Sequence, residues 1–132
     1  MKLSRTVSYA LQATLQLAQS GADVPVPCSR LAAEGKMPER FLLQVLRNLV
    51  AHGILESTRG VEGGYSLDRP PEEISLLEVI EAIEGPLGTA LPVSEGMSEE
   101  GKSRLQQALS DVTAVARREL AAIKLAHLLP TA

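Results

Sequence analysis

Proline and glycine residues cut the first 87 residues of this 132-residue chain into short segments, and this punctuation limits the fold more than any other feature. The breakers include Pro25, Pro27, Gly35, Pro38 and Gly53. By contrast, residues 102–129 contain no proline or glycine. The chain is therefore expected to form several short elements followed by one long helix.

Three short helices are predicted from apolar residues that recur at steps of three and four. The first covers residues 4–18, with Ser4 as its N-cap. The second covers residues 28–34 and the third covers residues 38–52. A tight turn at residues 35–37 joins the last two. This arrangement is the outline of a helix-turn-helix.

A β-hairpin is predicted next, because short alternating runs at 54–58 and 65–69 flank a glycine-rich connection. Ser75 and Glu78 then form a capping box at the start of a fourth helix that ends at Glu84. A helix-turn-helix followed by a hairpin is a winged helix. The predicted fold class is therefore mainly α with a small β-hairpin.

The long C-terminal helix needs a surface that the rest of the chain does not supply. A helix over residues 102–128 would be roughly 40 Å long, and a second copy of the chain is the economical partner for its apolar stripe. We expect a winged helix-turn-helix domain at 1–84, a linker at 85–98, and a dimerisation helix and tail at 99–132. The predicted dimer contacts are Leu105, Leu109, Val112, Ala116 and Ile123.

Composition and charge limit the functions that are open to the chain. Its net charge of −3 argues against a nucleic-acid partner when taken alone. Residues 1–69, however, carry 8 basic and 6 acidic side chains, whereas residues 70–132 carry 5 basic and 10 acidic ones. The predicted head is therefore mildly positive, although ordinary scatter of surface charge also accounts for such small numbers. With 2 Tyr, 1 Phe and no Trp, the core is expected to be aliphatic.

Catalytic, metal and membrane functions find little support in the sequence. The single cysteine, Cys28, excludes an intramolecular disulfide and any metal site built from several cysteines of one chain. His52 and His127 lie at the ends of separate predicted helices, and no nucleophile and base are paired. We therefore expect no enzyme activity, cofactor or metal. The chain has neither a membrane-spanning apolar run nor a secretory pattern, which predicts a cytoplasmic protein.

The third predicted helix carries the candidate DNA contacts. Arg40 and Gln44 lie one turn apart near its start, where Arg can bridge guanine and Gln can bridge adenine in the major groove. Arg47 is better placed for a phosphate. This polar face alone is equally typical of a solvated helix. Arg59, at the base of the glycine-rich hairpin tip, favours DNA because a cation there can follow the backbone or enter the minor groove.

Ordered motifs over residues 1–87 resemble the Rrf-two family of bacterial winged-helix transcriptional regulators. Known members include the iron–sulfur cluster regulator, the nitric-oxide-sensing repressor and the cysteine-metabolism repressor. The motifs are Met1-Lys2-Leu3-Ser4, Tyr9-Ala10-Leu11, Arg40-Phe41-Leu42, Gln44-Val45-Leu46, Gly53-Ile54-Leu55, Arg59-Gly60, Gly63-Gly64-Tyr65 with Leu67, Pro70-Pro71-Glu72-Glu73-Ile74-Ser75-Leu76 and Glu84-Gly85-Pro86-Leu87.

The resemblance implies a homodimer that binds double-stranded DNA at a palindromic operator. It also implies a role for each matching residue. Arg40, Phe41 and Gln44 would lie in or at the edge of the major groove. The minor-groove wing would consist of Arg59, Gly60, Gly63 and Gly64.

Three departures from the family pattern bear on function. Metal-sensing members carry three cysteines in the loop that matches residues 85–98, and this loop has none. The usual Pro-Gly after Arg59-Gly60 is Val61-Glu62, and position 43, often Glu, is Leu43. We therefore expect a dimeric, sequence-specific repressor without an iron–sulfur cluster. A small-molecule or protein effector would bind near residues 85–98 and the junction of the head with the long helix.

Two other functions stay open at this point. One is a regulator of the same fold that contacts proteins and has weak or lost DNA binding, since Glu39 and Glu62 oppose phosphate binding. The other is redox sensing through Cys28, although only Arg30 is near in sequence to lower the pKa of the thiol.

Overall fold

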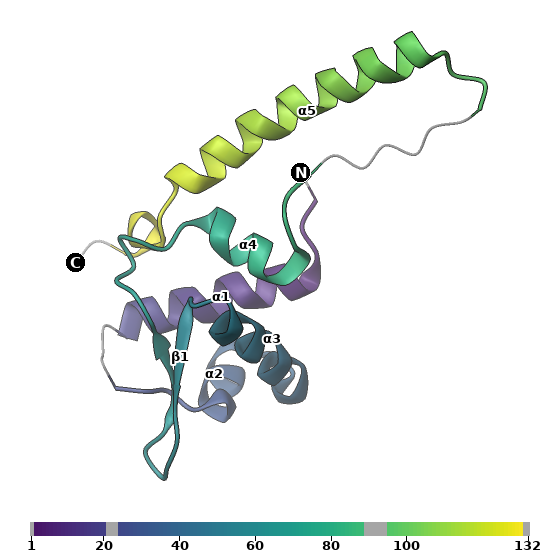
Figure 1. The fold of residues 1–132 in the computed structure, drawn as a ribbon. Helices are drawn as coiled ribbons and strands as arrows, with labels where there is room; N and C mark the ends of the chain where they lie inside the picture. Colours follow the sequence, from purple (N-terminus) through teal and green to yellow (C-terminus); the bar gives the residue numbers. More distant parts are fainter. Residues whose placement is uncertain (1, 21–23, 89–94, 131–132) are drawn as a thin grey trace.

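The computed structural model describes residues 2–20, 24–88 and 95–130 (Figure 1). Its elements confirm the predicted fold class, a set of helices with one two-stranded antiparallel hairpin. In chain order they are α1 (Arg5–Ser20), α2 (Cys28–Gly35), α3 (Glu39–Ala51), β1 (Leu55–Thr58), β2 (Gly64–Leu67), α4 (Leu76–Glu84), α5 (Glu99–Ala122) and the short 3-10 helix η1 (Leu125–Leu128).

The first four helices enclose an aliphatic core, as the low aromatic count predicts. Ser4 caps α1, since its hydroxyl oxygen accepts a hydrogen bond from the Val7 amide at 3.2 Å. Burial of branched aliphatic side chains supplies the main driving force for this packing. The largest fully buried side chains are Leu31, Leu42, Leu46, Leu49, Ile54, Leu55, Ile74, Ile80, Leu125, Val7, Val45 and Val79.

The turn between α2 and α3 is fixed from two sides. Lys36 follows α2 in the left-handed conformation, with φ 55° and ψ 48°. The Met37 amide then donates to the Ala32 carbonyl at 2.9 Å, and the Met37 side chain is buried. From α1, the Gln12 amide group donates to the Gly35 carbonyl at 2.8 Å. These contacts hold α3 at a defined angle to α2, as a helix-turn-helix requires.

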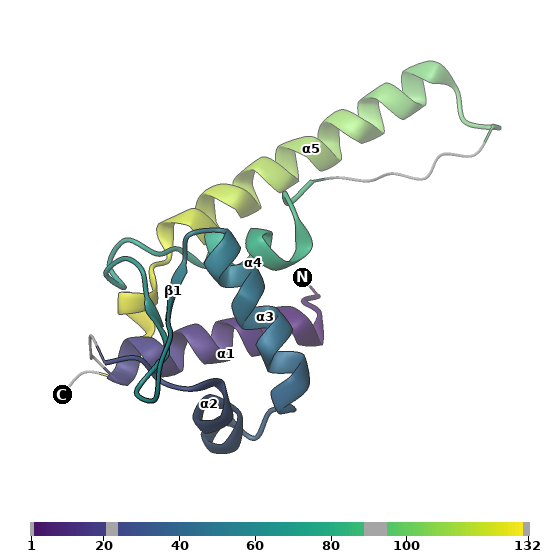
Figure 2. The ribbon, with the colours of Figure 1, turned by 60° about the horizontal axis from the view of Figure 1, so that its bottom comes forward.

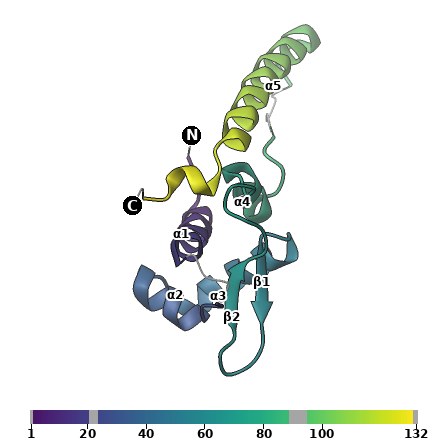
Figure 3. The same ribbon diagram turned by 90° about the vertical axis from the view of Figure 1, so that its left-hand side faces the viewer.

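The β-hairpin forms a wing that extends past α2 and α3 (Figure 3). Leu55 pairs with Leu67 and Thr58 pairs with Gly64 in an antiparallel register. Buried Ile54 and Leu55 anchor the base of β1 in the core. A further bridge joins Tyr65 to Val26, with two backbone hydrogen bonds of 2.8 Å. The wing is thereby attached to the segment that precedes α2.

Ser75 and Glu78 form the predicted capping box at the start of α4. The Ser75 hydroxyl accepts from the Glu78 amide at 3.1 Å, and the Glu78 carboxylate accepts from the Ser75 amide at 3.4 Å. The helix ends at Glu84, and Gly85 caps it with φ 83°. Within the predicted loop 85–98, residues 89–94 lie outside the described residues, and the rest form neither helix nor strand.

Helix α5 has 24 residues and a length of about 36 Å. It leaves the body on the side opposite to the wing (Figures 1 and 2). It begins at Glu99, where Ser98 caps its first turn by accepting from the Gly101 amide at 3.0 Å. No helix among the described residues meets the length and hydropathy needed to cross a bilayer.

The predicted continuation of this helix to Leu128 is wrong, and Ile123 is not helical. At Ile123 the chain becomes extended and returns to the head. The Ile123 carbonyl accepts from the Leu76 amide, and the Leu125 amide donates to the Ile74 carbonyl, both at 2.9 Å. Leu125 is then fully buried. Burial of Leu125 and the two backbone hydrogen bonds, at the Ile123 carbonyl and the Leu125 amide, stabilise this path more than another turn of exposed helix would.

Candidate nucleic-acid interface

Helix α3 buries one face and presents the other to solvent. Leu42, Val45, Leu46 and Leu49 point into the core. The exposed face carries Arg40, Gln44, Arg47 and Asn48, at steps of three and four. Within the described part of the chain, Arg40, Gln44 and Arg47 make no side-chain hydrogen bond or ion pair. Their polar groups are therefore available to a partner.

Phe41 lies at the edge of this exposed face. Its side chain is 43% exposed, and the ring packs edge-to-face on Tyr9 with centroids 5.7 Å apart and planes at 76°. Such aromatic pairs stabilise a contact beyond simple burial of area. Phe41 therefore attaches α3 to α1 while part of its side chain stays in solvent. Contact of Phe41 with DNA stays a prediction from the family resemblance.

A hollow of about 380 Å³ separates α3 from the wing. It brings together three of the predicted contacts, Arg47 from α3 and Arg59 and Gly64 from the wing, and its lining includes no carboxylate. Two guanidinium groups with nearby hydroxyls are the side-chain chemistry that binds a phosphodiester. The residues that line it are Arg47, Val50, Ser57, Thr58, Arg59, Gly64 and Tyr65.

Sequence reasoning missed Ser57 and Thr58 in this hollow. No local sequence signal marks them, because only the packed structure shows that Leu55 is buried and that the three following residues of β1 are exposed. An exposed strand next to a predicted recognition helix faces whatever that helix binds. Hydroxyl side chains in such a place are typical phosphate donors.

The glycines of the wing each have a structural reason to be glycine. Gly60 has φ 114°, which suits a residue without Cβ. A Cβ on Gly63 would lie 2.1 Å from the Thr58 carbonyl oxygen, and one on Gly64 would lie 2.4 Å from the Val26 carbonyl carbon. The backbone conformation of the wing therefore requires glycine at these positions. Direct contact of Gly60, Gly63 and Gly64 with DNA stays a prediction.

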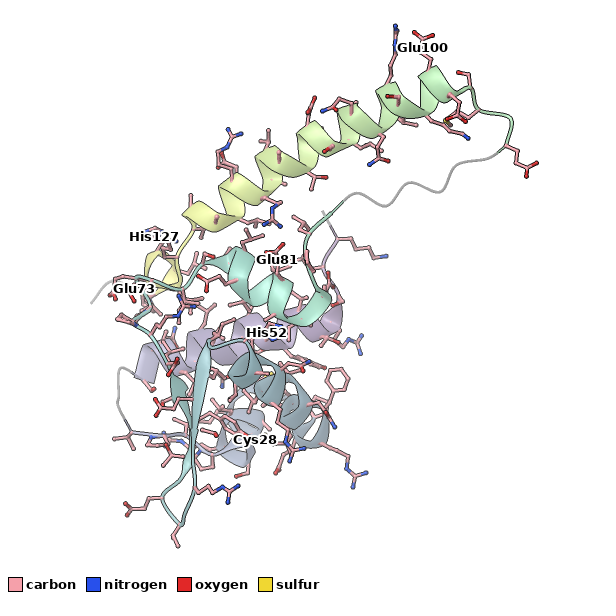
Figure 4. All side chains as sticks on the ribbon, in the orientation of Figure 1. Cys28, His52, Glu73, Glu81, Glu100 and His127 are labelled. Atoms are coloured by element: carbon pink, nitrogen blue, oxygen red, sulfur yellow. The ribbon has the colours of Figure 1, made fainter. Side chains whose placement is uncertain are left out.

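Cys28 lies at the start of α2 beside α3 (Figure 4). Its thiol donates to the Glu39 carbonyl oxygen at 3.7 Å. Partial burial, helped by the nearby Glu39 carboxylate, raises the pKa of the thiol. Since the thiolate is the reactive form of cysteine, this environment makes Cys28 less reactive at neutral pH. The geometry therefore argues against redox sensing through Cys28.

This raised pKa leads to a test by alkylation. We expect iodoacetamide to modify Cys28 in the folded protein more slowly at pH 7 than in the urea-unfolded protein. The folded rate should climb with pH to a midpoint above that of the unfolded thiol, because the protonated form persists to higher pH. Equal or faster modification of the folded protein at pH 7 would contradict this assignment.

Among the residues that the structure describes, no three His, Cys, Asp or Glu side chains gather in a way that could hold a metal ion. The described surface instead offers an exposed polar helix face, two arginines on one hollow, and a projecting wing. Together with the fold, these features define a winged helix-turn-helix regulator that binds DNA.

The family follows from comparison with known proteins. Residues 3–131 match the Rrf2 family, described as iron-dependent transcriptional regulators, and the chain belongs to this family. An HTH-type transcriptional regulator of Mycobacterium tuberculosis H37Rv is 35% identical over 123 residues, covering 93% of this chain and 75% of that protein. CymR of Bacillus subtilis is 29% identical over 114 residues, covering 85% and 83%. Both relatives are described as transcriptional regulators, the class of protein that the sequence predicts.

Solved structures agree with this assignment. The structure of CymR from B. subtilis, described as the global cysteine regulator of that organism, has a TM-score of 0.78 at 24% identity, and the match covers 97% of this chain and 95% of that one. At that identity it supports the fold alone. CymR from Staphylococcus aureus gives a TM-score of 0.75 at 26% identity, covering 98% of each chain. IscR from T. potens gives 0.70 at 27% identity, covering 97% and 85%.

Proposed function

We propose that the protein is a homodimeric repressor that reads a palindromic operator, with α3 in the major groove and the wing in the adjoining minor groove. The observation that carries this proposal is the hollow whose lining includes both Arg47 of α3 and Arg59 of the wing. A sugar-phosphate backbone that passes through this hollow has α3 on one side and the wing on the other. That is the geometry of a winged helix on duplex DNA.

Within this complex, Arg40 and Gln44 are the candidate base readers. Both are exposed on the first turns of α3, the part of a recognition helix that reaches base edges. The Arg40 guanidinium would pair with guanine O6 and N7, and the Gln44 amide would pair with adenine N6 and N7. Arg47 lies further along the helix and lines the hollow, which assigns it to a phosphate.

The proposed dimer forms through α5, none of whose residues is fully buried. Leu105, Val112 and Val115 are 39%, 66% and 50% exposed, and Ala108 is exposed beside them. Their spacing of three, four and three residues is that of a coiled-coil seam. The predicted contacts Leu109 and Ala116 are half-buried, and Ile123 lies past the end of the helix. We therefore place the centre of the interface on this exposed seam, residues 105, 108, 112 and 115.

We also propose that this member works without an iron–sulfur cluster, although the family is described as iron-dependent. Such clusters are held chiefly by several cysteine thiolates. The chain has one cysteine, and Cys28 is in α2 with its thiol hydrogen-bonded to Glu39. The loop at 85–98 contains no cysteine and no histidine. These donors do not fit a cluster, so no step is assigned to one.

Repression is the regulatory outcome that requires the fewest contacts. A dimer that covers an operator blocks access to it through the DNA contacts alone, without any contact to polymerase. Action on DNA places the proposed function in the cytoplasm.

Salt-dependent titration tests the contact that carries the proposal. Duplexes selected from a random DNA pool would be labelled and titrated by fluorescence anisotropy over a salt series. We expect Arg59→Ala to weaken binding about tenfold and to reduce the log–log salt slope by about 0.9, the value for one phosphate. The control Arg118→Ala removes an exposed cation from α5, and it should leave affinity and slope unchanged. An unchanged slope in Arg59→Ala would contradict the wing assignment.

A protein-binding regulator is the second candidate, and one observation favours it. Glu62 is exposed at the wing tip, where a carboxylate opposes approach to phosphates. This candidate predicts that the selection enriches no duplex even at low salt, and that the protein co-purifies with an enzyme or another regulator. Enrichment of a palindrome would contradict it.

A further inference from the structure

Val61 stands at the tip of the wing with its side chain completely in solvent, at 105% relative exposure. The Gly63 amide donates to the Gly60 carbonyl at 3.0 Å, so residues 60–63 form a tight turn with Val61 and Glu62 at its two corners. Gly60 supplies the positive φ on one side of the turn, and Gly63 fits closely against Thr58 on the other. An ordered turn thus holds an apolar side chain in water, where it gains nothing for the free protein.

The position of the hollow indicates what Val61 would meet, if the proposed function holds. Arg59 lines the hollow that we assign to a phosphate backbone. Val61 follows two residues later, at the first corner of the turn, so at most about 7 Å separates the Cα atoms of Arg59 and Val61, and the exposed valine side chain projects beyond the turn. The minor groove of B-DNA is about 7.5 Å deep. A wing whose arginine contacts the backbone therefore has the reach to bring its tip side chain to the floor of the adjoining groove.

We propose that Val61 is a specificity-determining residue that makes the wing select A·T over G·C pairs in the minor groove. In that groove, G·C differs from A·T by the guanine N2 amino group, which projects from the floor and carries hydrogen-bond donors. Valine methyl groups cannot accept a hydrogen bond, so they would leave this donor unpaired and collide with it. Against an A·T pair the same methyl groups meet only the adenine N3 and thymine O2 acceptors, so the additional unpaired donor and the bulk of the guanine amino group are absent.

Glu62, at the other corner of the turn, is the rival reader. A carboxylate would accept from the guanine amino group and would select G·C, the opposite preference. The phosphates on both sides of the minor groove repel a carboxylate and do not repel a valine. The narrow groove of A·T-rich DNA also carries the enhanced negative potential that attracts Arg59. Both effects favour Val61 at the groove floor, with Glu62 directed to solvent.

Inosine substitution tests this proposal at the level of single atoms. Inosine·C lacks the N2 amino group, so its minor groove resembles that of A·T while its major groove resembles that of G·C. The probes are duplexes enriched from a random pool, with each base pair in turn changed to A·T, G·C or inosine·C. At the position under the wing, we expect the wild type to bind A·T and inosine·C alike and G·C roughly tenfold more weakly.

Variants of Val61 and Glu62 test which side chain causes the preference for A·T over G·C. Val61→Ala should weaken binding to the A·T duplex roughly tenfold, the effect of losing about two buried methyl groups, with no change in salt slope. The discrimination against G·C should shrink as well. Glu62→Gln should strengthen binding to all three duplexes together. Leu128→Ala removes a 46% exposed leucine far from the wing and should match the wild type.

Each other outcome overturns a defined part of the account. Equal binding by Val61→Ala and the wild type would exclude Val61 as a reader. A wild-type preference for G·C over inosine·C that Glu62→Gln abolishes would assign the reading to Glu62 and overturn the proposal. Enrichment of no duplex at all would overturn the proposed function itself, and with it this inference.

Discussion

Two glutamates on the exposed seam of α5, in the variant Val112→Glu/Val115→Glu, are expected to convert the proposed dimer to monomers and to weaken operator binding about 100-fold or more. Both positions are at least half exposed in the single chain, at 66% and 50%. The substitutions therefore leave the fold of each chain intact. In a dimer paired along the seam, the new carboxylates would be buried without partners, which is costly.

The loss of affinity follows from the geometry of a two-site complex. When two heads are joined, binding of the first head makes binding of the second an intramolecular event, and the gain is lost in a monomer. Analytical ultracentrifugation would give the oligomeric state, and anisotropy titration would give the operator affinity. Circular dichroism would show that helix content is retained.

A matched control is available on the same helix. Ser103→Glu/Ser110→Glu adds the same charge at two exposed positions on the other side of α5, and it should remain dimeric with unchanged DNA binding. A dimeric Val112→Glu/Val115→Glu variant that binds the operator as the wild type does would place the interface elsewhere on the chain.

Gly64→Ala is expected to lower the free energy of unfolding by about 2–4 kcal/mol and to impair DNA binding through the wing. Gly64 has φ 153°, and an added Cβ would lie 2.4 Å from the Val26 carbonyl carbon and 2.5 Å from its oxygen. These neighbours are backbone atoms and cannot swing aside. Relief of the clash would break the two 2.8 Å hydrogen bonds between Val26 and Tyr65.

Urea unfolding would measure the loss of stability, and hydrogen exchange of the Val26 and Tyr65 amides would locate it. Gly96→Ala serves as the control, because Gly96 has no atom within 4 Å of an added Cβ. That variant should stay within about 0.5 kcal/mol of the wild type. If Gly64→Ala and Gly96→Ala unfolded at the same urea concentration, the close approach of the wing to Val26 would not describe the protein.

Local signals in the sequence were sufficient where one short segment determines its own structure. Ser4 caps α1, and Ser75 with Glu78 caps α4, because these hydrogen bonds join residues only three apart. The same holds for α3, whose apolar and polar faces follow from helical spacing alone. Arg40 and Gln44 could therefore be placed on one exposed face before any tertiary contact was known.

Contacts between segments that are distant in the sequence could not be predicted from local sequence patterns. Nothing near Ile123 signals that the long helix stops there, because the cause is a pairing with Ile74 and Leu76, almost 50 residues earlier in the chain. The bridge from Val26 to Tyr65 is of the same kind. The hollow that joins Arg47 and Arg59 also depends on how the wing packs beside α3, so Ser57 and Thr58 were overlooked.

The seam proposed from the exposed residues of α5 differs from the set of dimer contacts predicted from the sequence. Helical periodicity alone selected Leu109 and Ala116, which are half-buried in the single chain. The exposed seam instead includes Ala108 and Val115, about a third of a turn away. Apolar spacing identifies a stripe, but only packing against α4 and the head decides which edge of that stripe is left for a partner.

The most direct test of the central claim is selection of bound duplexes from a random DNA pool, followed by titration of the enriched duplex over a salt series. The account predicts a palindrome with half-sites about one helical turn, or a multiple of it, apart. It also predicts a log–log salt slope steep enough for several phosphate contacts, at about −0.9 for each. Failure to enrich any duplex at low salt would contradict the account.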